Sequence, residues 1–84
     1  MSTLDDIRHR LVSLAPMQLI VEDESELHVG HAGSQSGGGH FRIRIVSPQF
    51  KGKTPIERHR MVHAMLKDLL PDKIHALAID ARAP

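Results

Sequence analysis

Two stretches of the chain carry apolar residues at the three- and four-residue spacing of an amphipathic helix. The first begins after a cap at Ser2 or Thr3 and ends at Pro16, with these side chains on one face: Leu4, Ile7, Leu11 and Leu14. The second begins at Thr54, where threonine, proline and a glutamate three residues on form the signature of a capping box. It runs to about Leu70, and its core stripe is Val62, Met65, Leu66 and Leu69.

Three shorter segments have the two-residue period of a β-strand. The clearest covers residues 40–46, with three apolar side chains on a buried face and three polar ones on a wet, basic face: Phe41, Ile43 and Ile45 against His40, Arg42 and Arg44. Residues 17–22 predict a short strand. Residues 73–81 predict a last strand in which one face is shared by His75, Leu77 and Ile79.

The order helix, strand, strand, helix, strand limits the topology of the sheet. Strands joined through a helix lie parallel with a right-handed crossover, so the last two strands are expected to be parallel. The first two are better joined antiparallel. We therefore predict one small α+β domain over residues 1–84, with a three-stranded mixed sheet covered on one face by helices.

The segment between the first two strands has a different composition. Residues 23–39 carry five of the six glycines together with His28 and His31. Such a segment has too little apolar surface to pack as regular structure, and we expect a mobile loop rich in glycine and histidine.

Composition narrows the classes of function. The 84 residues have a formal net charge of +1 and only two aromatic residues, Phe41 and Phe50, which argues against a strongly basic or base-stacking nucleic-acid binder. Cysteine is absent, so the chain has no disulfide and no thiolate nucleophile. No apolar run is long enough to span a bilayer and the start does not read as a signal peptide, so we expect a cytoplasmic protein away from membranes.

Seven histidines in so short a chain make nitrogen ligation of a metal the chemistry to consider. His75 opens the last strand, and His28, His31 and His40 lie in or beside the segment that could reach it. A single histidine on an apolar face is usually a core residue, so that interpretation stays open. Two imidazoles alone make an incomplete site, because structural metal sites use four ligands and catalytic ones about three. A two-histidine half-site therefore makes most sense if a partner completes it.

Two other motifs are weaker. His59 and His63 have the spacing of zinc-protease helices, but Arg60 stands where that motif needs glutamate, and a polar helix flank packed beside the core is the favoured interpretation. A hydrolytic zinc site there remains as an alternative. Residues 30–33 spell GxxG between two strands, whereas the phosphate-binding turn of that pattern joins two helices.

Four cations cluster around the start of the second helix. They are Lys51, Lys53, Arg58 and Arg60. The cluster could bind phosphate or an acidic partner, but nearby carboxylates dilute it, and a solvated helix start is the favoured interpretation. No serine–histidine–acid arrangement can be assigned from spacing.

Several of these segments together resemble the signatures of the BolA family. They stand in the family's order and span nearly the whole chain: Asp23-Glu24-Ser25 with His28, His40-Phe41, Val46-Ser47 with Phe50-Lys51-Gly52-Lys53, Arg58-His59-Arg60, and Ile74-His75-Ala76-Leu77-Ala78-Ile79. The resemblance implies a class II KH-like α+β fold, which agrees with the element order. It also implies a protein that is not an enzyme.

The resemblance carries a partner and a cofactor with it. BolA-like proteins pair with monothiol glutaredoxins, and the pair holds a [2Fe–2S] cluster between them. The resemblance implies His75 as one ligand and His28 as the second, with His31 and His40 as alternatives in the same role. Sulfur would come from the glutaredoxin and from glutathione, since this chain is of the histidine-ligating kind. Lys53, Arg58 and Arg60 would then be contacts for the partner or for glutathione carboxylates.

The resemblance leaves a second function open. Some BolA-like proteins are linked to transcription, so a KH-like regulator that binds DNA through the four cations is the alternative to a cluster-sharing adaptor in iron–sulfur trafficking or iron and redox regulation. Without its partner the chain is expected to be a monomer or a weak homodimer.

Overall fold

A computed structural model of the protein describes residues 2–24, 39–70 and 72–84. Within these ranges the order of elements is the one expected from the sequence. They are α1 (Thr3–Leu11), β1 (Gln18–Asp23), β2 (Gly39–Val46), α2 (Pro55–Leu66) and β3 (Ile74–Arg82), with short 3-10 helices at Val12–Leu14, Pro48–Phe50 and Lys67–Leu69. The second predicted helix thus consists of α2 and a last turn of tighter helix.

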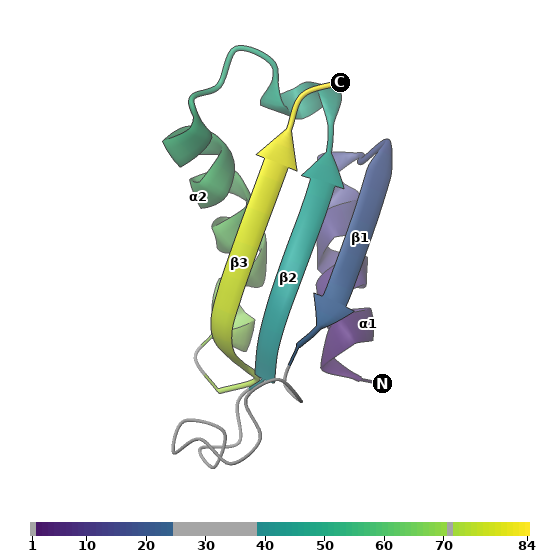
Figure 1. The fold of residues 1–84 in the computed structure, drawn as a ribbon, viewed down its shortest axis with the longest axis vertical. Helices are drawn as coiled ribbons and strands as arrows, with labels where there is room; N and C mark the ends of the chain where they lie inside the picture. The colour runs from purple at the N-terminus through teal and green to yellow at the C-terminus, as the bar shows by residue number, and fades with distance from the viewer. Residues whose placement is uncertain (1, 25–38, 71) are drawn as a thin grey trace.

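The three strands form one mixed sheet in the order β1-β2-β3. β1 pairs with β2 in antiparallel orientation. β2 pairs with β3 in parallel orientation, and α2 lies in the connection between these two strands (Figure 1). Both pairings were predicted from the connections between strands. Asp23 and Gly39, the two ends of the predicted loop, belong to β1 and β2, while residues 25–38 lie outside the described residues.

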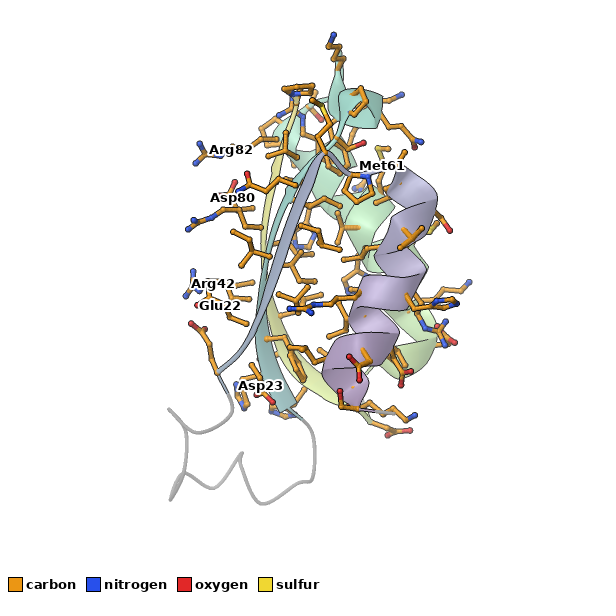
Figure 2. All side chains as sticks on the ribbon, turned by 90° about the vertical axis from the view of Figure 1, so that its right-hand side faces the viewer. Glu22, Asp23, Arg42, Met61, Asp80 and Arg82 are labelled. Carbon is orange, nitrogen blue, oxygen red and sulfur yellow. The ribbon has the colours of Figure 1, made fainter. Side chains whose placement is uncertain are left out.

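Both helices cover the same face of the sheet, and the other face carries charged side chains (Figure 2). The core lies between the two layers. It consists of Ile7, Leu11, Leu14, Val21, Phe41, Ile43, Ile45, Phe50, Val62, Leu66, Leu69 and Ile74. The helix stripes and the alternation in β2 predicted most of this set. Three members of the core were not in that prediction: Val21 in β1, Ile74 at the start of β3, and Phe50. Phe50 is fully buried and comes from the connection after β2, not from a strand or a long helix.

The start of α2 is fixed by the capping box that its sequence predicts. The backbone N–H of Glu57 donates to Thr54 Oγ1 at 3.1 Å, and the backbone N–H of Thr54 donates to Glu57 Oε1 at 2.8 Å. Each bond satisfies a backbone donor that the helix itself leaves without an acceptor.

This capping box makes the stability of the domain depend on pH in the acidic range. The hydrogen bond from the Thr54 backbone lowers the pKa of Glu57 below its ordinary value of 4.5. A carboxyl group with a lowered pKa in the folded state stabilises the fold above its ordinary pKa, and the contribution is lost as pH falls through the folded pKa. We expect the stability difference between the wild type and Glu57→Gln to be constant near pH 7 and to shrink below about pH 4.5. Thermal unfolding of both proteins across this range tests it, and a difference that grows on acidification would contradict it.

Ser47 joins the end of the α1 segment to the end of β2. Its side chain is fully buried, and Ser47 Oγ donates to the backbone carbonyl of Leu14 at 2.6 Å. The same oxygen accepts from the backbone N–H of Gln49 at 3.1 Å, which caps the 3-10 helix that follows. One hydroxyl therefore satisfies two backbone groups from distant parts of the chain.

Replacement of Ser47 by alanine is expected to lower the free energy of unfolding by about 1–3 kcal/mol, since it leaves a buried carbonyl without its donor. Urea unfolding followed by far-ultraviolet circular dichroism measures the change. Ser13→Ala is the matched control, because Ser13 is exposed and its loss should change stability by no more than about 0.5 kcal/mol. Equal stabilities for the two variants would show that the buried bond contributes nothing.

Candidate functional site

The candidate site lies at the end of the sheet where β1 ends and where β2 and β3 begin, at the bottom of Figure 1. Backbone hydrogen bonds close this end. The N–H of Glu24 donates to the carbonyl of His40 at 2.7 Å, and the N–H of Gly39 donates to the carbonyl of Lys73 at 3.1 Å. The side chains at this end are thus held by all three strands.

An irregularity in the pairing of β2 and β3 determines where His75 lies. Gly39 pairs with Ile74, but the next residue, His40, pairs with Ala76, so one step on β2 spans two on β3. Ile74 consequently occupies the core and is fully buried, while His75 is exposed. Regular alternation had placed His75 with Leu77 on the inner face. The extra residue corrects this prediction, and it excludes a core role for His75.

His75 faces a second histidine of the candidate set. The ring centroids of His40 and His75 are 5.4 Å apart, and the ring planes are inclined by 51°. His40 is half-buried, and its Nε2 atom lies below the surface. The structure therefore brings together one exposed and one partly covered imidazole, from adjacent strands of the sheet.

A hollow of about 220 Å³ lies beside His40. Its lining combines one carboxylate, one imidazole and the small or apolar residues at the start of β3: Glu24, His40, Phe41, Ala76, Leu77 and Ala78. The carboxylate is not free for a cation, because Glu24 Oε2 accepts a hydrogen bond from Arg42 Nε at 3.1 Å. This end of the sheet thus offers the imidazole nitrogens of His40 and His75 beside a carboxylate that is already bonded to an arginine.

Two of the predicted ligands, His28 and His31, lie outside the described residues, as does the GxxG sequence at 30–33. The described part of the chain fixes the two points between which they run, Glu24 and Gly39. Both points lie at the same end of the sheet as His75.

The predicted cation cluster lies at the opposite end of the sheet. Arg58 Nη1 donates to the carbonyl of Ala81 at 3.5 Å, and Arg58 Nε donates to the carbonyl of Lys53 at 3.0 Å. Six residues of strand separate Ala81 from His75, which corresponds to about 20 Å. The guanidinium of Arg58 is therefore bonded to the backbone of its own domain, whereas Lys51, Lys53 and Arg60 are exposed. The structure therefore does not bring this cation cluster together with His40 and His75.

The outward face of the strand at residues 40–46 was predicted to be wet and basic, and Arg42 and Arg44 of β2 are exposed as expected. On the helix-free face of the sheet, carboxylates pair with the arginines. Arg42 pairs with Glu24, just after β1, at 3.1 Å, and Arg44 pairs with Asp80 on β3 at 3.9 Å. Arg82 pairs with Asp80 of its own strand at 2.9 Å. The hydrogen bond from Arg82 to Asp80 raises the pKa of Arg82. In Figure 2 the side chains of Arg42, Asp80 and Arg82 project from the face that no helix covers. The neutralisation could not be found from β2 alone, because it depends on the register of three strands.

The other histidine pair, His59 and His63, is exposed on α2. The favoured interpretation of this pair was a polar helix flank beside the core, and it agrees with the structure, because the exposed pair adjoins the buried Val62 and Leu66 on the same helix. Across residues 2–24, 39–70 and 72–84, no group of three or more His, Cys, Asp or Glu side chains is placed to hold a metal ion. The described residues thus provide pairs of nitrogen donors and no complete site.

None of the helices in the described ranges has the length and apolar content that crossing a membrane requires.

Comparison with known proteins gives consistent matches. The sequence profile of the family described as "BolA-like protein" matches residues 7–84. SufE-like protein 1, chloroplastic/mitochondrial, from Arabidopsis thaliana is 43% identical over 84 residues, which cover 93% of this chain and 23% of that protein. BolA-like protein 1 from Homo sapiens is 44% identical over 72 residues, which cover 86% of this chain and 50% of that protein. The chain thus spans half or less of the length of these two relatives.

Solved structures match over the whole chain. The BolA domain of SufE1 from Arabidopsis thaliana superposes with a TM-score of 0.85 at 41% identity, covering 100% of this chain and 94% of that one. The solution structure of BolA1 from Mus musculus gives a TM-score of 0.77 at 41% identity, covering 96% of this chain and 64% of that one.

Proposed function

The chain belongs to the BolA family, and from this premise we propose that it is a non-enzymatic adaptor that binds a monothiol glutaredoxin and shares a [2Fe–2S] cluster with it. The cluster would serve iron–sulfur trafficking or the regulation of iron and redox state. His75 is the first ligand in this proposal and His28 the second, and the sulfur ligands come from a glutaredoxin cysteine and from glutathione.

The observation that carries the proposal is the exposure of His75 at the end of the sheet. The extra residue in β3 places Ile74 in the core and leaves the next side chain outside it. An imidazole in this position can meet a partner without any rearrangement of the core. A strand of regular pairing would place residue 75 on the inner face with Leu77.

The donor set fits the proposed cluster as half of a site. With no cysteine in the chain, it cannot ligate a cluster through sulfur. Paired imidazoles on one iron are an established alternative to paired thiolates, and they raise the reduction potential because they are neutral. A cluster held in this way supplies one-electron chemistry and transferable iron and sulfide. The residues of this chain contribute nitrogen ligands and the surface around them.

Chain length supports His28 as the second ligand. His28 is four residues beyond Glu24 in the sequence, and four residues of fully extended chain reach at most about 14 Å. Glu24 itself bonds to His40, the neighbour of His75. His31 and His40 remain the alternatives. His40 is close enough, but its Nε2 is buried and has to be uncovered before that nitrogen can bind a metal.

The described residues do not favour the nucleic-acid alternative. Of the four cations assigned to it, Arg58 is bonded to backbone carbonyls, and the arginines of the open face are paired with carboxylates. Mutation of Lys51, Lys53 and Arg60 together is the test of that alternative. It predicts weaker DNA binding and a shallower salt dependence, whereas the adaptor proposal predicts no change in either.

Reconstitution tests the adaptor proposal. The full chain is mixed with a monothiol glutaredoxin, glutathione, ferric iron and sulfide without oxygen, and then separated by size. We expect a coloured heterocomplex whose visible circular dichroism differs from that of the glutaredoxin reconstituted alone. A colourless chain that elutes by itself while the glutaredoxin retains all the iron would contradict the proposal.

A further inference from the structure

A second pair of imidazoles lies on α2, away from the end of the sheet that holds His40 and His75. His59 and His63 are one helical turn apart, and both side chains are exposed. Their ring centroids are 6.0 Å apart, and the ring planes are inclined by only 20°. The pair is thus already arranged with both rings on the same side of the helix.

We propose that His59 and His63 form a surface site for a divalent transition-metal ion that prefers imidazole ligands, such as Zn²⁺ or Cu²⁺. Each ion lies about 2.0–2.1 Å from a ligating imidazole nitrogen, so two rings that share an ion at a tetrahedral angle have centroids about 5 Å apart. The observed centroid separation of 6.0 Å is larger than this distance. Rotation about the torsions of the two exposed side chains is sufficient to close the difference. No backbone movement is needed to close the site.

The helix that carries the pair is well fixed. Val62 and Leu66, which lie three residues after His59 and His63 respectively and on the adjoining stripe of α2, are fully buried in the core. The capping box between Thr54 and Glu57 holds the first turn, only two residues before His59. The two imidazoles therefore start from a rigid scaffold, and binding an ion restricts little more than their own torsions.

The surroundings define the class of site. No third His, Cys, Asp or Glu within the described ranges completes the pair, so water fills the remaining positions around the ion. A site with two protein ligands and open positions exchanges its ion readily, unlike a closed four-ligand structural site. Arg60, also exposed, adds a positive charge beside the pair and lowers its affinity for cations. Arg60 also leaves the site without the general base that hydrolysis needs, so the site binds a metal and does not catalyse hydrolysis.

Zinc titration of the untagged full chain tests this site without removing any residue. Because Zn²⁺ is diamagnetic, the ring nitrogens of all seven histidines can be followed by two-dimensional nitrogen–proton spectroscopy. We expect the ring signals of His59 and His63 to shift together at the same zinc concentration. Shifts confined to other histidines would overturn the proposal.

Calorimetric titration of variants gives the affinity. We expect His59→Ala and His63→Ala each to weaken zinc binding at α2 by at least about tenfold. Even residues that only support a metal ligand cost about this much when they are mutated. His9→Ala removes an exposed imidazole from α1 and is the matched control, with no change expected. All variants are made on a His75→Ala background, so that the sheet-end pair does not contribute. Unchanged affinity in both α2 variants would overturn the proposal.

The result is independent of the adaptor proposal. With His75 retained, His59→Ala and His63→Ala should still form the cluster-bearing heterocomplex, and failure of the zinc site would leave the assignment of His75 untouched.

Discussion

Replacing Phe50 by alanine is expected to lower the free energy of unfolding by about 3–5 kcal/mol, the range for removing a large buried aromatic side chain. Phe50 is fully buried, and it contributes to the core from the 3-10 helix that follows β2. Domains gain about 0.05–0.15 kcal/mol of stability per residue, which gives about 4–13 kcal/mol for 84 residues. The substitution therefore removes a large part of the stability of the whole domain.

Chemical unfolding measures this effect, and far-ultraviolet circular dichroism is the suitable probe because the chain has no tryptophan or tyrosine. Ile56→Ala is the matched control. Ile56 is also a large apolar residue at the start of an element, but its side chain is 65% exposed, so its loss should change stability by no more than about 0.5 kcal/mol. Equal stabilities of Phe50→Ala and Ile56→Ala would contradict the burial of Phe50 in the core.

Replacing His75 by alanine is expected to abolish the shared cluster while leaving the fold intact. The side chain is exposed, so its removal opens no cavity in the core. Mutation of a residue that only supports a metal ligand typically weakens metal binding by about 10–100-fold. His75 is a direct ligand in the proposal, so its loss should weaken cluster retention in the heterocomplex by at least about 100-fold. The measurement is the visible circular dichroism of the heterocomplex during a glutathione competition, with His9→Ala as the control that retains the wild-type spectrum.

Single substitutions at the other three candidates identify the second ligand. The proposal expects His28→Ala to lose the spectrum as His75→Ala does. His31→Ala and His40→Ala should keep an imidazole-ligated spectrum, although His40→Ala removes the ring that lies 5.4 Å from His75 and can alter the orientation of the latter. Loss of the spectrum in His40→Ala together with retention in His28→Ala would move the second ligand into β2.

The architecture was predictable because its elements follow simple periods. The three- and four-residue spacing of Leu4, Ile7 and Leu11 identified α1, and the alternation around Phe41 identified β2 and its buried face. The connection through a helix then required β2 and β3 to be parallel. Each of these arguments uses only local sequence and the general handedness of crossover connections.

The departures arise from tertiary structure. The extra residue that exposes His75 is a property of the pairing between β2 and β3, and the sequence of β3 read alone continues its alternation through residue 75. Phe50 lies in an irregular connection, where no period marks it as buried. Arg58 was counted with the exposed cations because nothing in the sequence shows that the end of β3 returns beside the start of α2.

The candidate site was predictable in part for the same reason. The composition, with many histidines and no cysteine, indicated nitrogen ligation, and family resemblance selected His75. The contact between His40 and His75 depends on the parallel register of two strands that are far apart in the chain. The separation of the cations from the histidines, by the length of β3, likewise appears only once the sheet is assembled.

In the proposed heterocomplex, this chain supplies nitrogen ligands to a cluster whose other ligands come from the glutaredoxin and from glutathione. Pulsed electron paramagnetic resonance of the reduced heterocomplex can detect these ligands when this chain alone is labelled with ¹⁵N and the glutaredoxin and glutathione are not. We expect strong ¹⁵N couplings from directly bound imidazole, which disappear in His75→Ala. A cluster that forms in the heterocomplex but shows only the weak nitrogen couplings of an all-sulfur site would contradict this proposal.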